Sequence, residues 1–152
     1  MIDSGLAAFL EGGLSIHLGT RDAHLQPNGV RAAALRVEDA GTHLTVYVAK
    51  VAAARVLPDL RSNGQVAVVV CRPTDDRSCQ VKGHLVSVRA ARADERAIVA
   101  SQWEGFLEQL ALIGIPRATT EGWTTWPAVA IRLRATALFD QTPGPGAGAP
   151  LS

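Results

Sequence analysis

Six side chains of this sequence could together bind a phosphorylated ligand: Arg31, Arg36, Lys50, Arg55, Gln80 and Lys82. A guanidinium group holds a phosphate through paired hydrogen bonds, and the Gln80 amide can both donate to and accept from the edge of a heteroaromatic ring. Because Gln80 and Lys82 are two residues apart, they share one face of a strand. Arg31 and Arg36 are five apart, so both reach one phosphate only beside a bulge or at a strand end.

A simpler interpretation of the same residues is structural. Charged side chains on exposed strands protect sheet edges from pairing with other chains. Spacing alone leaves both interpretations open.

The sequence lacks the motifs of common catalytic and nucleotide-binding sites. It contains no Gly-x-Ser-x-Gly elbow, P-loop, His-Glu-x-x-His or Gly-x-Gly-x-x-Gly. Its four histidines do not pair at helical ligand spacing, and Asp75 and Asp76 lie where a hairpin turn is expected. Cys71 and Cys79 have no neighbouring Cys or His at ligand spacing, so we expect reduced cysteines and no metal site.

Composition narrows the class of protein further. The chain has 152 residues, 47% of them hydrophobic, which is enough for one globular domain with its own core. A net charge of +1 gives no long-range field that would attract nucleic acid or an anionic membrane. No signal-peptide pattern is present, and no apolar run approaches the ~18 residues of a membrane span. We expect a cytoplasmic protein without nucleic-acid or membrane partners.

Hydrophobic periodicity predicts a mainly β domain. A short helix capped by Asp3 or Ser4 comes first. Alternation with a period of two then predicts six strands, at 14–18, 30–37, 43–50, 66–71, 79–88 and 129–139. The apolar phase slips between Leu85 and Val86, which predicts a bulge. Helices are expected at 52–61 and 94–113, and the second should bury a face made of Val99, Trp103, Phe106, Leu110 and Ile113. Six antiparallel strands with peripheral helices favour a small barrel.

The end of the chain differs in composition from the rest. Residues 141–152 are rich in Pro and Gly and cannot continue a strand or a helix, so we expect a surface tail that is extended or mobile. The predicted domain therefore covers residues 1–140.

Four short segments, in this order, resemble the pyridoxamine 5'-phosphate oxidase-like FMN-binding family. They are the arginine-bearing strand 31–36, the strand end 46–50, the helix end 60–64 and the Gln-x-Lys-Gly strand within 78–83. The resemblance covers nearly the whole chain. It implies a six-stranded antiparallel split β-barrel with peripheral helices, and a homodimer whose two flavin sites form between the subunits.

The resemblance also assigns roles to individual residues. It implies that the FMN phosphate lies on Arg31, Arg36 and Arg55, with Lys50 nearby, and that Tyr47 and Val48 pass along the flavin. Gln80 and Lys82 would border the ring. Trp123 and Trp126 would either cover the flavin face or pack in the core or interface, and both readings stay open.

The sequence departs from the family pattern at two places. The Ser-Arg-Lys phosphate cluster of the family falls on Ala54, Arg55 and Val56, so only the arginine is kept. The Arg-x-His of the true oxidases is absent near the C-terminus, where residues 139–144 read Phe-Asp-Gln-Thr-Pro-Gly. We therefore do not expect pyridoxamine phosphate to be the substrate.

The function predicted from the resemblance is that of an FMN-dependent oxidoreductase with an unidentified small-molecule substrate or electron donor. One alternative is a flavin-binding carrier or stress-related sensor that performs no turnover, since no general acid or base is evident. Another is the same barrel binding a deazaflavin or haem. The sequence argues against haem, because the haem-degrading relatives would need a late histidine and none follows His84.

Overall fold

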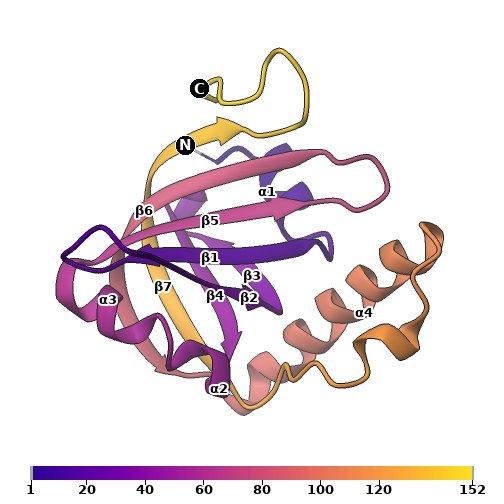
Figure 1. Cartoon of the computed structure of the whole chain (residues 1–152), viewed down its shortest axis with the longest axis horizontal. Helices are drawn as coiled ribbons and strands as arrows, with labels where there is room; N and C mark the ends of the chain where they lie inside the picture. The colour runs from indigo at the N-terminus through magenta and orange to yellow at the C-terminus, as the bar shows by residue number, and fades with distance from the viewer. Residues whose placement is uncertain (1, 152) are drawn as a thin grey trace.

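A computed structural model describes residues 2–151 of the chain. Figure 1 shows a curved sheet closed into a barrel, with helices around it. The seven strands are β1 (Ser15–Arg21), β2 (Pro27–Ala32), β3 (Ala34–Glu38), β4 (His43–Ala49), β5 (Gln65–Cys71), β6 (Ser78–Ala90) and β7 (Ala128–Asp140). The α-helices are α1 (Ser4–Leu10), α2 (Lys50–Ala53), α3 (Leu57–Asn63) and α4 (Arg96–Leu112). Short 3-10 helices lie at Asp39–Gly41, Ala93–Glu95 and Arg117–Thr120.

The sheet is antiparallel throughout, with the strand order β2-β1-β5-β6-β7-β4-β3. The strand expected at 30–37 is divided at Ala33 into β2 and β3, which form the two opposite edges of the sheet. Ala33 donates its N–H to the carbonyl oxygen of Tyr47 at 2.9 Å, so the bend itself is tied to β4. One bent strand thus closes a barrel of six predicted strands, and the mainly β split-barrel prediction is confirmed.

The core fills the barrel interior and follows the predicted alternation. On β1, for example, Ile16 and Leu18 are buried while His17 is exposed. Strand β4 is an exception to this alternation, because every residue after His43 is buried. The central inward side chains of the barrel are fully buried: Ile16, Leu18, Val46, Val68, Val81, Ile131 and Leu133. The N-terminal helix packs against this core through Phe9 and Leu10, and the Asp3 carboxylate caps it by accepting the Leu6 N–H at 2.8 Å.

The single helix expected at 52–61 is instead two helices, α2 and α3, separated by residues 54–56. Pro58 accounts for the division, because it lacks the N–H that a continuous helix would bond to Ala54. In the first turn of a new helix that missing donor costs nothing, and Pro58 sits there in α3. Gly64 ends α3 in the left-handed conformation, with a φ of 68°.

Strand β6 carries the bulge predicted beside Leu85 and a second one beside Gly83. Its register against β7 shifts between Leu85 and Ser87, as the slip in apolar phase indicated, and again between Lys82 and Gly83. At the second shift β7 approaches the backbone closely. A Cβ atom on Gly83 would lie 2.4 Å from the carbonyl oxygen of Arg134, so this position requires glycine.

Helix α4 covers the β3 side of the barrel and extends beyond it (Figure 1). Val99, Phe106 and Leu110 are buried as predicted, but Ile113 is 47% exposed because the end of the helix projects past the sheet. The buried face also includes Gln102, whose amide accepts the Leu35 N–H at 3.0 Å and donates to the Leu35 carbonyl at 2.7 Å. This amide replaces the strand partner that β3 lacks on its outer edge.

The described part of the tail folds back onto the barrel. Pro150 forms a bridge with Phe139, and Leu151 donates its N–H to the Leu138 carbonyl at 2.9 Å. Ser152, the last residue of the predicted tail, lies outside the described residues. Across residues 2–151, no helix is both long enough and apolar enough to pass through a membrane.

Candidate functional site

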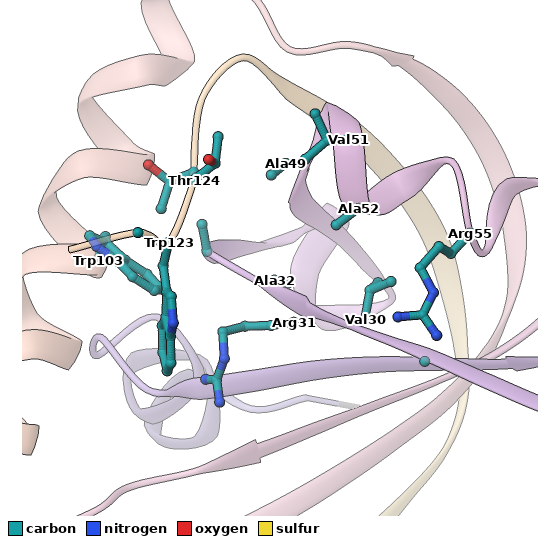
Figure 2. Close-up of a pocket in the computed structure, with 14 residues that line it drawn as sticks. Val30, Arg31, Ala32, Ala49, Val51, Ala52, Arg55, Trp103, Trp123 and Thr124 are labelled. Carbon is teal, nitrogen blue, oxygen red and sulfur yellow. The ribbon is translucent and has the colours of Figure 1, made fainter. Parts of the chain in front are cut away.

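A cavity of about 440 Å³ lies between β2, the start of α2, α4 and the segment that precedes β7. Figure 2 shows its lining, with Arg31 and Arg55 on either side of Val30, the Trp123 ring beside Arg31, and the Trp103 ring next to Trp123. Small residues form one wall: Ala32 at the end of β2, Ala33 at the bend, Ala49 at the end of β4 and Ala52 in α2. The volume is within the range of small-molecule and cofactor sites.

Arg31 is a cation in the cavity lining that contacts aromatic rings and a hydroxyl group. Its guanidinium carbon lies 4.6 Å from the centroid of the Trp123 ring and 5.3 Å from that of Phe106. Its Nη1 donates a hydrogen bond of 3.1 Å to the Ser15 hydroxyl. Within residues 2–151 no carboxylate forms an ion pair with it. Desolvation by burial lowers its pKa, yet arginine stays protonated, so a partly buried and unneutralised cation lines the cavity.

Arg55 supplies the second cation, and the interruption between α2 and α3 determines where it lies. Its side chain is exposed to solvent along the cavity wall. Its carbonyl accepts a hydrogen bond from the Asn28 side chain, which ties this turn to the start of β2. Arg31 and Arg55 are therefore the two sequence-predicted phosphate ligands that share one cavity.

Gln80 lies in a neighbouring cavity of about 410 Å³ on the outer face of the sheet. Both cavities are bordered by Gly29, Val30 and Arg31, so Arg31 faces each of them. Strand register places Arg31, His17, Val69 and Gln80 directly opposite one another on β2, β1, β5 and β6. They form one row across the sheet.

Lys82 and Lys50 lie outside both cavities. Lys82 lines a further groove with Arg21 and His84, and its Nζ lies 5.1 Å from the centroid of the Phe139 ring. Lys50 is exposed at the first position of α2, where its N–H bonds the carbonyl oxygen of Pro127 at 2.9 Å.

Tyr47, Val48 and Arg36 also lie away from the main cavity. Tyr47 and Val48 are completely buried in β4. Burial and the hydrogen bond to Glu95 raise the pKa of Tyr47 to about 12, and the neighbouring Arg36 acts in the opposite direction. Arg36 pairs with Thr45, which shares one face of β4 with Tyr47, so the bend at Ala33 places Arg36 on the Tyr47 side and away from the main cavity.

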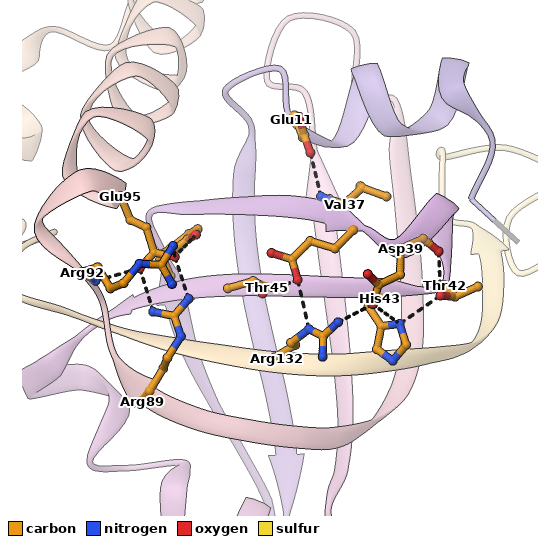
Figure 3. Close-up of polar contacts among 12 residues, drawn as sticks. Glu11, Val37, Asp39, Thr42, His43, Thr45, Arg89, Arg92, Glu95 and Arg132 are labelled. Carbon is orange, nitrogen blue, oxygen red and sulfur yellow. Dashed lines mark hydrogen bonds and ion pairs between the residues drawn. The ribbon is translucent and has the colours of Figure 1, made fainter.

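Glu95 joins β4, β6 and the start of α4 into one ionic cluster (Figure 3). Its carboxylate is 2% exposed and accepts two hydrogen bonds from Arg89, at 2.6 and 2.7 Å. It also accepts one from the Arg92 N–H at 2.7 Å and one from the Tyr47 hydroxyl at 3.0 Å. The Arg89 contact is the largest reason that the pKa of Glu95 falls to about 2. This cluster fixes α4, and with it Trp103 and Phe106, against the barrel.

Sequence reasoning identified one of the two aromatic residues beside Arg31, Trp123, and missed the other, Phe106. Trp103 and Phe106 were assigned to the buried face of α4, yet Trp103 lines the cavity and Phe106 contacts Arg31. Trp123, one of the two residues left open, lines the cavity, whereas Trp126 packs against the small buried cluster that includes Tyr47 and Val99. Trp123 and Trp126, just before the last strand, were the sequence signal for an aromatic residue at this site.

The sequence itself matches no protein-family model and no curated protein. Solved structures do match over most of the chain. An F420 reductase has a TM-score of 0.59 at 19% identity, over 86% of this chain and 93% of that one. A proposed pyridoxamine 5'-phosphate oxidase of Lactobacillus delbrueckii has a TM-score of 0.56 at 13% identity, over 90% and 91%.

An FMN-binding protein from Syntrophomonas wolfei has a TM-score of 0.53 at 14% identity, over 87% of this chain and 81% of that one. At such identities the likeness concerns the fold. These similarities extend across nearly the full length of the domain. The chain therefore has the fold of the pyridoxamine 5'-phosphate oxidase-like FMN-binding split barrels.

Proposed function

We propose that this protein binds FMN and is an oxidoreductase in which the flavin exchanges hydride or electrons with a small molecule. The observation that carries the proposal is Arg31, a partly buried cation beside two aromatic rings, with a hydroxyl as its polar partner. A buried charge without a counter-ion is costly, and a phosphate would neutralise it. The similarity to an FMN-binding protein of the same fold supports the choice of flavin.

The residues of the cavity fit a phosphorylated planar cofactor. Arg31 and Arg55 would hold its phosphate, and the Trp103 and Trp123 rings offer flat apolar surface nearby. Gln80 would hydrogen-bond the ring edge from the adjacent cavity, and Lys82 lies one row further along β6. Once bound, the flavin would supply the redox chemistry, while the protein would hold it and exclude water from one side.

A flavin carrier or sensor without turnover is the second candidate, and the lining of the cavity favours it. Arg31 and Arg55 are the two charged groups along the main cavity, and neither is a general acid or base near neutral pH. Steady consumption of a reduced nicotinamide by the purified protein would count against this candidate. Flavin binding without reduction by any donor would support it.

The cofactor proposal is tested by the visible absorption spectrum of the purified protein, followed by heat release and identification of the chromophore. We expect FMN in about one-to-one ratio to the chain. The likeness to an F420 reductase makes a deazaflavin the most informative alternative outcome. A released deazaflavin or haem would overturn FMN while leaving the barrel as a cofactor site. A colourless protein that also fails to bind added FMN would reject the proposal.

We also propose that the protein is a homodimer. The end of α4 supports this, because Leu112 is 75% exposed and the following residue Ile113 is 47% exposed, where the helix extends beyond the barrel (Figure 1). Exposed apolar side chains in a group are typical of an interaction surface. Sedimentation analysis should give twice the chain mass, and replacing both residues with Ser should shift the equilibrium to monomer.

A further inference from the structure

The second cavity contains a residue with no assigned role, His17, at the centre of the row Arg31, His17, Val69 and Gln80. The side chains of this row lie on adjacent strands, which are about 4.8 Å apart in a sheet. Three of them can form hydrogen bonds, and Val69 and Val30 provide apolar surface beside them. The His17 ring remains accessible to solvent. A ligand that lies along this row would contact His17 between Arg31 and Gln80.

We propose that His17 contacts the ligand directly and that this row binds the hydrogen-bonding edge of a planar, uncharged or anionic ring. The inference rests on the proposed function, because it concerns the ring of the cofactor whose phosphate Arg31 would hold. A His17 imidazole in its neutral form offers one donor and one acceptor, and the Gln80 amide offers both as well. Such a pair complements a ring edge on which carbonyl and N–H groups alternate.

The charges around His17 favour the neutral imidazole. Desolvation against the sheet lowers its pKa, and the positive charge of Arg31 across β2 lowers it further. The residues opposite it on β5 and β6, Val69 and Gln80, carry no charge, and the next position on the same face of β6 is the cation Lys82. No carboxylate lines this cavity in the described part of the chain, so a cationic ring is disfavoured.

Riboflavin is the probe that isolates this contact, since it carries the same ring as FMN without the phosphate. Its affinity is measured by titration for the wild type, His17→Ala, His17→Gln and the matched control His24→Ala, near pH 8 and near pH 5. His24 is exposed in the turn between β1 and β2, outside both cavities. Because the His17 side chain is exposed on the outer face of the sheet, all variants should fold, which circular dichroism checks.

We expect His17→Ala to weaken riboflavin binding about tenfold near pH 8, corresponding to one lost hydrogen bond. His17→Gln should retain most of the affinity, because it keeps a donor and an acceptor. Affinity of the wild type should fall in acid, as protonation removes the acceptor nitrogen, and the His17→Gln variant should lack this fall. The His24→Ala variant should behave as the wild type does.

Two results separate failure of this inference from failure of the proposed function. If His17→Ala binds riboflavin as tightly as the wild type at both pH values, the His17 contact is wrong. In that case FMN binding that still depends on Arg31 would leave the proposed function intact. If the wild type binds neither FMN nor riboflavin, both proposals are overturned.

Discussion

The guanidinium carbon of Arg31 lies 4.6 Å from the centroid of the Trp123 ring, and both residues line the main cavity. Trp123 belongs to the segment between α4 and β7, so a strand residue and a connecting segment meet at the site. Stacking between a guanidinium and an aromatic face leaves the N–H groups at its edge free to bind an anion. The pair therefore orients the cation that we propose to hold a phosphate.

Removing the Trp123 ring should weaken FMN binding without unfolding the protein. Trp123 is 41% exposed, so its loss costs little core packing, while Arg31 loses a cation–π contact worth about 1 kcal/mol. We expect Trp123→Ala to lower FMN affinity about fivefold, measured by flavin fluorescence quenching. Trp123→Phe should restore most of it, since a ring remains. Unchanged affinity in the Ala variant would show that the stacking does not orient Arg31.

Stability should depend on Glu95 in a pH-dependent way. Its pKa is about 2 in the folded protein against 4.5 ordinarily, so it stabilises the fold above pH 4.5 and loses this effect as the pH falls toward 2. Near pH 7, Glu95→Gln should lower the free energy of unfolding by about 2 kcal/mol, and the difference should shrink in acid. Urea denaturation across this pH range measures it.

Glu104→Gln is the matched control for Glu95. Glu104 also pairs with an arginine, Arg117, but both side chains are exposed on the surface. Surface ion pairs contribute little, so this variant should leave stability nearly unchanged. Equal destabilisation by the two variants would contradict the role given to the buried cluster.

The Gln102 amide should be needed for stable docking of α4 on β3. It is buried and satisfies both backbone groups of Leu35, which would otherwise lie buried without partners. Gln102→Leu should cost about 2 to 4 kcal/mol in chemical denaturation, although the volume is nearly conserved. Gln109→Leu on the same helix, which removes one contact with the Thr74 side chain, should cost much less. A tolerated Gln102→Leu change would mean that β3 finds other partners.

Gly83 should not tolerate a side chain. A Cβ atom there would lie 2.4 Å from the Arg134 carbonyl oxygen and 2.8 Å from a methyl group of Leu133. Gly83→Ala should destabilise the protein by about 2 kcal/mol or more, seen as a lower thermal midpoint. Gly146→Ala is the control, because its Cβ would meet open space. If both variants melt alike, the close approach at the bulge is not maintained in solution.

Most of the fold could be predicted because its signals are local. Alternation with a period of two identified the strands, and the phase slip beside Leu85 identified a bulge. The bend at Ala33 could not be predicted, since residues 32–34 are all alanine and contain no turn signal. The bend arises because β2 pairs with β1 at one edge of the sheet and β3 pairs with β4 at the other, which is a long-range property.

The candidate site was predictable only in part, for the same reason. Arg31 and Arg55 could be named from the sequence, but only the bend shows that Arg36 faces Tyr47 instead of their cavity. Phe106 appeared as an ordinary member of the buried face of α4, because helical periodicity does not reveal which strand residue it meets. The presence of Pro58 could have predicted the break between α2 and α3, which determines the position of Arg55.

The most direct test of the central claim compares FMN affinity in the wild type, Arg31→Ala and Arg36→Ala. Both variants remove one half-buried arginine from the same bent strand, so they are closely matched. We predict that Arg31→Ala weakens FMN binding at least about tenfold, as expected for a lost charge-assisted contact, while Arg36→Ala stays near the wild type. Equal affinity in the wild type and Arg31→Ala, or a loss confined to Arg36→Ala, would contradict the account.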